Sequence, residues 1–282
     1  MSASLPSTRG TTFPLWADEI RALPTSFARS ALFTVGSLKS TRAVCKDTHV
    51  ASASGINMLF TGEELRQDDE DVFLQLVHLS RGRPTEEGIE FTAHAVLQQL
   101  GWSTGALGYK RLKATLDRMK RGEIKLLAKE GRRGFVGSLI SSWGWREEET
   151  SNSVRAKMFV RFDSAILELF GAQPYTQLQW QERAGLSSMM AKWLHTFLIT
   201  QPATRAINLE ELKALSGSRA GSLRTFRETV RDALAELKAN GIISDWRMSI
   251  DSVFFAMPGG EPLMKLIPGT VLDRTREEHQ PA

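Results

Sequence analysis

The sequence has little of the chemistry that marks a secreted, membrane-bound or redox protein. It contains a single cysteine, Cys45, so neither an internal disulfide nor a thiolate metal site can form. No run approaches the roughly 18 consecutive apolar residues that span a bilayer. The first residues, MSASLPSTRGTTFPLW, lack the basic and then apolar layout of a secretion signal. We therefore expect a cytoplasmic protein with no membrane partner.

Residues that could carry catalysis are also scarce. A DNA-nicking enzyme needs a tyrosine nucleophile and usually paired histidines that hold a metal. The only tyrosines here are Tyr109 and Tyr175, and the five histidines never fall at ligand spacing. No GxxxxGK[ST] phosphate loop occurs, and the stretch GRRGFVG lacks the lysine and serine that would hold a nucleotide and its metal. The sequence therefore predicts a protein that is not an enzyme and holds no metal or cofactor.

What is present is a chain of 282 residues, enough for two domains, with a formal net charge of only +4. The charge is unevenly distributed. Residues 105–139 carry ten basic side chains against three acidic ones, which makes a basic block inside a nearly balanced chain. Such a block favours an anionic partner more strongly than the net charge does.

The first half has the order of elements of a winged helix. Four acids, from Asp68 to Asp71, stand where a helix dipole favours negative charge, and we prefer this interpretation to a metal site. A basic third helix is followed by two apolar runs joined by EGRRG, which indicate a hairpin. In a winged helix the third helix lies in the DNA major groove and the hairpin reaches the backbone beside it. The strand, helix, strand, helix and helix expected before that hairpin lie at residues 56–61, 71–82, 88–92, 92–101 and 109–123.

The same order returns in the second half. A helix, a strand, two helices and a hairpin are expected at residues 186–201, 205–208, 208–217, 223–241 and 242–257. Leu97 and Leu100 coincide with Leu212 and Leu215 when the two copies are superposed, as expected of a repeated helix-turn-helix core. The repeat predicts an α+β, mainly helical fold of two tandem winged-helix domains. We place these domains at 16–172 and 173–258, between a flexible segment at 1–15 and a flexible tail at 259–282.

The third helix of the second copy carries an arginine stripe. Arg224, Arg227 and Arg231 are three and four residues apart, so they share one side of the helix, and Arg219 lies in the turn before it. Because arginine can hold a guanine edge by two hydrogen bonds, the stripe predicts base reading in duplex DNA. Some aromatic side chains could instead stack on melted single strands, although most are expected in the core. These aromatic residues are Trp143, Trp145, Trp193, Trp246, Phe254 and Phe255.

Several long blocks of the chain resemble, in order, the TrfA replication initiators of broad-host-range plasmids. The resemblance covers residues 14–256 and includes WADEIRALPTSFARSALFT, FTGEELRQDDEDVFLQLVHLSRGRP, EFTAHAVLQQLGWS, LFGAQPYTQLQWQERAGLSSMMAKWLHTF and LRTFRETVRDALAELKANG. It implies a protein that binds direct repeats, the iterons, at a plasmid origin and helps open the adjacent AT-rich DNA. It also implies recruitment of host DnaA and replicative helicase, and an equilibrium between origin-binding monomers and dimers that limit copy number.

The resemblance also implies different roles for the two domains in DNA binding. The second domain would supply most base contacts, through Arg219, Arg224, Arg227 and Arg231. The first would supply backbone contacts and the dimer surface, through the helix residues Lys110, Arg111, Lys113, Arg118 and Arg121 and the wing residues Arg132 and Arg133.

Two points stay open at the level of the sequence. The family has a sliding-clamp-binding pentapeptide of the QL[SD]LF kind before the tryptophan that matches Trp16, whereas this chain reads PSTRGTTFPLW there. The resemblance therefore does not carry clamp binding to this chain. The same two domains would also suit a DNA-binding transcriptional regulator or autorepressor, and the residues fit both roles.

Overall fold

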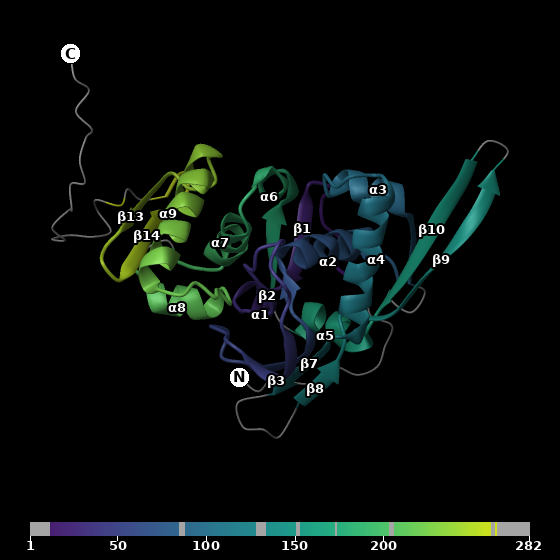
Figure 1. Cartoon of the computed structure of the whole chain (residues 1–282), viewed down its shortest axis with the longest axis horizontal. Coiled ribbons are helices and arrows are strands. Elements are labelled where there is room, and N and C mark those ends of the chain that lie inside the picture. The colour runs from purple at the N-terminus through teal and green to yellow at the C-terminus, as the bar shows by residue number, and fades with distance from the viewer. Residues whose placement is uncertain are drawn as a thin grey trace, which may run out of the picture.

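In the computed structural model the chain folds around two apolar cores, and the helices and strands that surround them form two groups that lie side by side (Figure 1). The structure describes residues 12–84, 88–127, 134–150, 153–172, 174–202, 206–260 and 263. The first core extends from Phe13 to Trp180 and the second from Leu186 to Phe255. We call the parts around these cores the first unit and the second unit. Among the described residues, no helix is long and apolar enough to cross a bilayer.

The first unit contains a three-stranded antiparallel sheet whose first strand is separated along the chain from the other two by helices. In chain order these elements are α2 (Gln67–Ser80), β6 (Ile89–Thr92), α3 (Ala93–Gln99), α4 (Ala106–Arg121), β9 (Ile140–Thr150) and β10 (Ser153–Phe162). The strands lie in the order β6-β10-β9, and the β9–β10 hairpin projects from the body (Figure 1). The Thr92 hydroxyl caps α3 by accepting the Ala95 amide at 3.3 Å, as expected of a threonine before a helix.

The second unit repeats this arrangement. Its elements are α7 (Met189–Ile199), β12 (Ile207–Asn208), α8 (Leu209–Leu215), α9 (Leu223–Ala239), β13 (Asp245–Met248) and β14 (Ser252–Ala256). The sheet order is β12-β14-β13, so in both units the first strand pairs with the last. The Asn208 side chain caps α8 and the Ser222 side chain caps α9. The two units thus share a similar order of helices and strands, although two further strands, at residues 123–127 and 134–137, stand between α4 and β9 in the first unit.

The hairpin expected over 124–145 does not belong to the sheet that contains β6. Its strands do pair, but they form one side of a separate four-stranded sheet of order β3-β4-β7-β8. The strands of this sheet are β3 (Val44–Val50), β4 (Asn57–Glu63), β7 (Glu123–Leu127) and β8 (Gly134–Gly137). Ile124 and Leu126 of β7 are buried opposite Phe60 and Met58 of β4, and this apolar contact fixes the pairing. The hairpin that pairs with β6 is β9–β10, which begins later in the chain.

Two further strand pairs connect distant parts of the first unit, and the first of them joins its two ends. β1 (Ile20–Pro24) runs antiparallel to β11 (Tyr175–Gln179), and β2 (Phe33–Thr34) runs parallel to β5 (Leu65–Arg66). The short helices of this unit and of its link to the second are α1 (Thr25–Ala28), α5 (Ser164–Ala172) and α6 (Trp180–Gly185). Because β11 and Trp180 pack in the first core, that core continues past the domain boundary expected at 172.

The predicted flexible ends are described only in part. Residues 1–11 lie outside the described residues, whereas Phe13 is buried in the first core and meets Phe162 and Phe170 edge to face. Of the tail from 259, only residues 259, 260 and Leu263 are described, and Leu263 is buried. The expectation of a loose segment up to residue 15 is therefore wrong at Phe13, because its ring fills an aromatic cluster.

Candidate nucleic-acid interface

Helix α9 presents arginines beside a fully buried apolar face. Its buried residues include Phe226, Val230, Ala233, Leu234 and Leu237, which confirms the amphipathic pattern. Arg224 has a side chain that is 90% exposed, and Arg231 is also exposed. Arg227 is half-buried, and its Nε has no hydrogen-bond partner among the residues that the structure describes. The stripe therefore offers two freely reachable guanidinium groups and one that is partly covered.

Two arginines of the second unit differ in the ion pairs that they form. The Arg224 Nε lies 3.5 Å from Glu228 Oε1, a surface pair one turn apart that is worth only about 0.3–0.5 kcal/mol and is easily exchanged for a phosphate or a base. Arg219 Nη2 instead lies 2.6 Å from the Oε1 of Glu64, a buried carboxylate of the first unit. The exposed face of α9 also carries two acids, Glu228 and Asp232, which the sequence-based prediction of the stripe left out.

Some basic residues of helix α4 in the first unit are exposed, and others contact aromatic or acidic side chains. Lys110 and Arg121 are exposed, and Arg121 keeps 79% of its side-chain surface open. Lys113 lies with its Nζ 4.1 Å from the centre of the Trp145 ring. Arg111 stacks on Trp102 at 3.5 Å and reaches Asp68 Oδ2 at 3.2 Å. Arg132 and Arg133, which were expected in the wing, lie outside the described residues, in the segment between β7 and β8.

Arg118 is not on the exposed face of α4, where its place in the sequence pattern had put it. Its side chain is 10% exposed, and its Nε and Nη2 donate to Asp69 Oδ1 at 3.1 and 2.7 Å. Nη2 also donates to Thr115 Oγ1 at 2.9 Å. The reason is helical geometry, because residues 111, 115 and 118 share a stripe at the border of the buried face and meet acids of α2 there.

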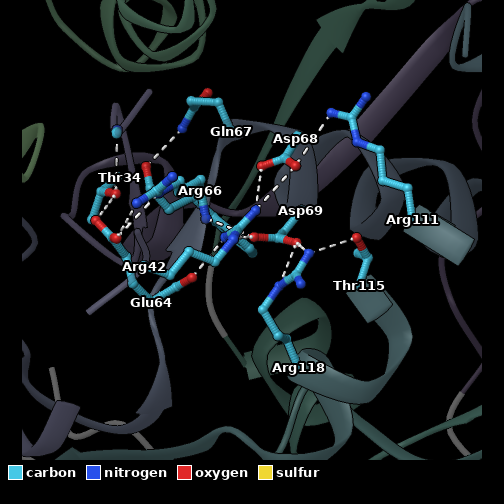
Figure 2. Close-up of polar contacts among 12 residues, drawn as sticks. Thr34, Arg42, Glu64, Arg66, Gln67, Asp68, Asp69, Arg111, Thr115 and Arg118 are labelled. Atoms are coloured by element: carbon cyan, nitrogen blue, oxygen red, sulfur yellow. Dashed lines mark hydrogen bonds and ion pairs between the residues drawn. The ribbon is translucent and has the colours of Figure 1, made fainter. Parts of the chain in front are cut away.

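The acids at the start of α2 form a buried ionic cluster with arginines of three segments (Figure 2). Asp69 Oδ2 accepts from Arg42 Nη1 at 2.5 Å and from the Arg66 amide at 2.8 Å, and Asp68 binds Arg42 and Arg111. Burial raises the pKa of Asp69, the neighbouring Asp68 raises it further, and Arg118 and Arg42 oppose the rise. The cluster begins a helix, as predicted, but it is packed inside the protein.

Glu64 and Arg66 extend the cluster toward the loop at 36–41. Arg66 is 1% exposed, and its guanidinium donates to Glu64 and to the carbonyl oxygens of Ser37, Ser40 and Thr41. Glu64 also accepts from Thr34 Oγ1 at 2.7 Å (Figure 2). Arg66 thereby gives this loop a fixed shape beside the turn that holds Arg219.

The alternatives to duplex binding gain little from the geometry. No group of three or more His, Cys, Asp or Glu side chains within the described part of the chain is arranged to hold a metal ion. Of the aromatic residues considered for stacking, Trp193 and Phe255 are buried in the second core. Trp145 is 50% exposed and stacks on Trp143 at 5.4 Å, so it is the aromatic residue of that set most open to a base.

The fold and the exposed basic helices define a two-unit α+β protein with a candidate nucleic-acid interface on each unit. The chain belongs to the TrfA protein family, whose family model matches residues 11–255. It is 27% identical over 230 residues to the plasmid replication initiator protein TrfA of Escherichia coli, which covers 81% of this chain. The chain spans 59% of the length of that relative. The resemblance stated from the sequence is thus confirmed.

A solved structure of domains 2 and 3 of RctB has a similar fold. Its TM-score is 0.52 at 13% sequence identity, and the match covers 78% of this chain and 87% of that chain. At this identity the likeness concerns the fold alone. Because the match covers 78% of this chain, the counterpart in that structure extends over both units and is not confined to one.

Proposed function

We propose that this protein is a plasmid replication initiator that binds direct repeats of duplex DNA at an origin through two tandem winged-helix domains. The observation that carries the proposal is the repeated architecture. Each unit contains a helix, a strand, two helices and a hairpin in that order, with the first strand paired to the last, and in the first unit β7 and β8 are inserted before the hairpin. In each unit the helix before the hairpin, α4 or α9, exposes basic side chains, as a major-groove helix requires.

The two units have different parts in this proposal. Arg224 and Arg231 of α9 read base edges, because a planar guanidinium can bind guanine by two hydrogen bonds. Lys110 and Arg121 of α4 contact phosphates, and lysine in particular suits a phosphate as a point charge. Arg111 and Arg118 are not assigned to DNA, since both are engaged by acids of α2. The β9–β10 and β13–β14 hairpins are the wings.

Membership of the TrfA family and the name of the Escherichia coli relative support initiation over regulation. We propose, further, that the protein helps open AT-rich DNA beside the repeats, recruits host DnaA and replicative helicase, and equilibrates between monomers and dimers that limit copy number. It acts by binding and not by catalysis.

The test is replication of a plasmid that carries only the candidate origin, with the protein supplied in trans. Wild-type protein should yield transformants, and Arg224→Ala should yield few or none. Lys238→Ala is the matched control, because Lys238 lies at the far end of the same helix in a surface pair with Asp245. Absence of transformants with wild-type protein, together with repression of a reporter through a single palindromic site, would identify a regulator instead.

A further inference from the structure

The first turn of α2, residues 67–71, is held from both sides. Toward the first unit, Asp68 and Asp69 bind Arg111 and Arg118 of α4, the candidate DNA helix (Figure 2). Asp69 is fully buried and the Arg118 side chain is 10% exposed, so this pair is shielded from solvent and salt, whereas Arg111 is partly open to solvent. A displacement of the turn would therefore displace α4 with it.

Toward the second unit, the same turn receives a buried guanidinium. Arg183 of α6 is 0% exposed and donates from Nε to Asp71 Oδ1 at 2.7 Å. Its Nη2 donates to Gln67 Oε1 at 3.0 Å and to the Gln67 carbonyl at 3.4 Å. Its Nη1 donates to the Lys192 carbonyl at 3.0 Å and to Thr196 Oγ1 at 2.7 Å. These contacts satisfy all the N–H donors that a guanidinium has.

Helix α7 adds direct contacts of its own. Lys192 Nζ lies 2.5 Å from Asp71 Oδ2, and Thr196 Oγ1 donates to Glu70 Oε1 at 3.3 Å. Helix α7 packs in the second core with α9, the other candidate DNA helix. Charged groups buried in a fixed hydrogen-bond network tolerate little sliding, because any shift leaves a charge unpaired away from water. The chain of contacts α4–α2–α7–α9 is therefore continuous and stiff.

We propose that the first turn of α2 sets the distance and angle between the two DNA-binding helices, with Asp71, Arg183 and Lys192 as positioning residues. The inference rests on the proposed function and deepens it. Because the link is rigid, the protein binds tightly only when the distance between two half-sites on the duplex matches the fixed distance between α4 and α9. None of the three residues touches DNA, so their loss should leave each unit able to bind its own half-site.

The experiment measures dissociation constants of the full chain for a spacing series. The duplexes carry the repeat protected by wild-type protein, the same repeat with one to five base pairs inserted between its halves, and each half alone. Five inserted pairs turn one half to the opposite side of a helix of about 10.5 base pairs per turn. The variants are Lys192→Met and the milder Asp71→Asn. Lys238→Met is the matched control, because its partner Asp245 belongs to the same unit.

Wild-type protein and Lys238→Met should lose about tenfold or more in affinity on insertion of two base pairs. Lys192→Met and Asp71→Asn should lose threefold or less, while binding each isolated half like wild type. Spacing profiles identical to wild type in both variants would overturn the coupling and leave the proposed function intact. If no protein, wild type included, bound any of the duplexes, the proposed function itself would fail. If Lys192→Met proved unable to fold, Asp71→Asn alone would decide.

Discussion

Replacement of Arg118 by alanine should destabilise the protein and not simply weaken DNA binding. Arg118 places two hydrogen bonds on Asp69 and one on Thr115, and both carboxylate and guanidinium are shielded from solvent. Breaking a buried ion pair from one side costs about 3–5 kcal/mol. Asp69 keeps Arg42 and the Arg66 amide as partners, so the loss should lie near the lower end, at about 3 kcal/mol.

Urea unfolding of the purified protein measures this loss. With a denaturant slope of about 3 kcal/mol per molar, the midpoint should fall by about 1 M. Arg121→Ala is the control on the same helix, and since its side chain is 79% exposed its stability should stay within about 0.5 kcal/mol of wild type. In Arg118→Ala/Asp69→Asn the loss should be smaller than the sum of the single losses, because the two groups interact directly. Equal midpoints for Arg118→Ala and Arg121→Ala, with only DNA affinity reduced in the former, would refute this reasoning.

Three further outcomes follow from the geometry. Arg224→Ala should cost about 1–3 kcal/mol on the cognate repeat and relax base preference at one or two positions, whereas Lys110→Ala should weaken all duplexes alike and lower the salt slope by about one. Titration of wild-type binding with salt should give a log-log slope of about −5 for six phosphate contacts, and a slope near zero would exclude duplex binding through these surfaces. Burial lowers the pKa of His78 to about 4, and Arg21 adds to the effect. In the unfolded chain the pKa of this histidine is near 6.5. The stability that the neutral ring contributes to the folded protein is therefore present above pH 6.5 and is lost as the pH falls from there toward 4. Between pH 7.5 and 5, wild type should lose about 2 kcal/mol more stability than His78→Gln, measured by urea unfolding. An equal loss in both proteins would contradict the buried neutral ring, and the exposed His94, changed to Gln, serves as the control.

Local features of the fold were readable from the sequence because their causes are local. Thr92 before α3 is a capping residue, and the apolar spacing of Phe226, Val230 and Leu234 can bury only one helix face. The helices of the repeat were readable for the same reason, whereas the hairpin of the first copy was misassigned, because strand pairing is set by distant residues. The pairing of β1 with β11 joins residues about 155 apart, and neither strand contains a signal that names its partner.

The exposure of the candidate DNA-binding side chains could be predicted only in part from the sequence. The exposed Arg224 and Lys110 follow from helix periodicity. The burial of Arg118 does not, because it depends on carboxylates that a distant helix brings to the same place. A signal was available in the spacing of Arg111 and Arg118, which are seven residues apart and therefore share the border of the apolar face. Arg183 had no such signal, since its partner carboxylate Asp71 lies on α2, 112 residues earlier in the chain.

A base-resolution footprint of the pure protein on the candidate origin tests whether both units bind each repeat. We expect protection on one face of the duplex, in two adjacent major grooves per repeat. The repeats should share one orientation and recur at about 21–22 base pairs, two helical turns of roughly 10.5 each. A footprint confined to a single palindrome, or no protection at salt concentrations that allow duplex binding, would contradict it.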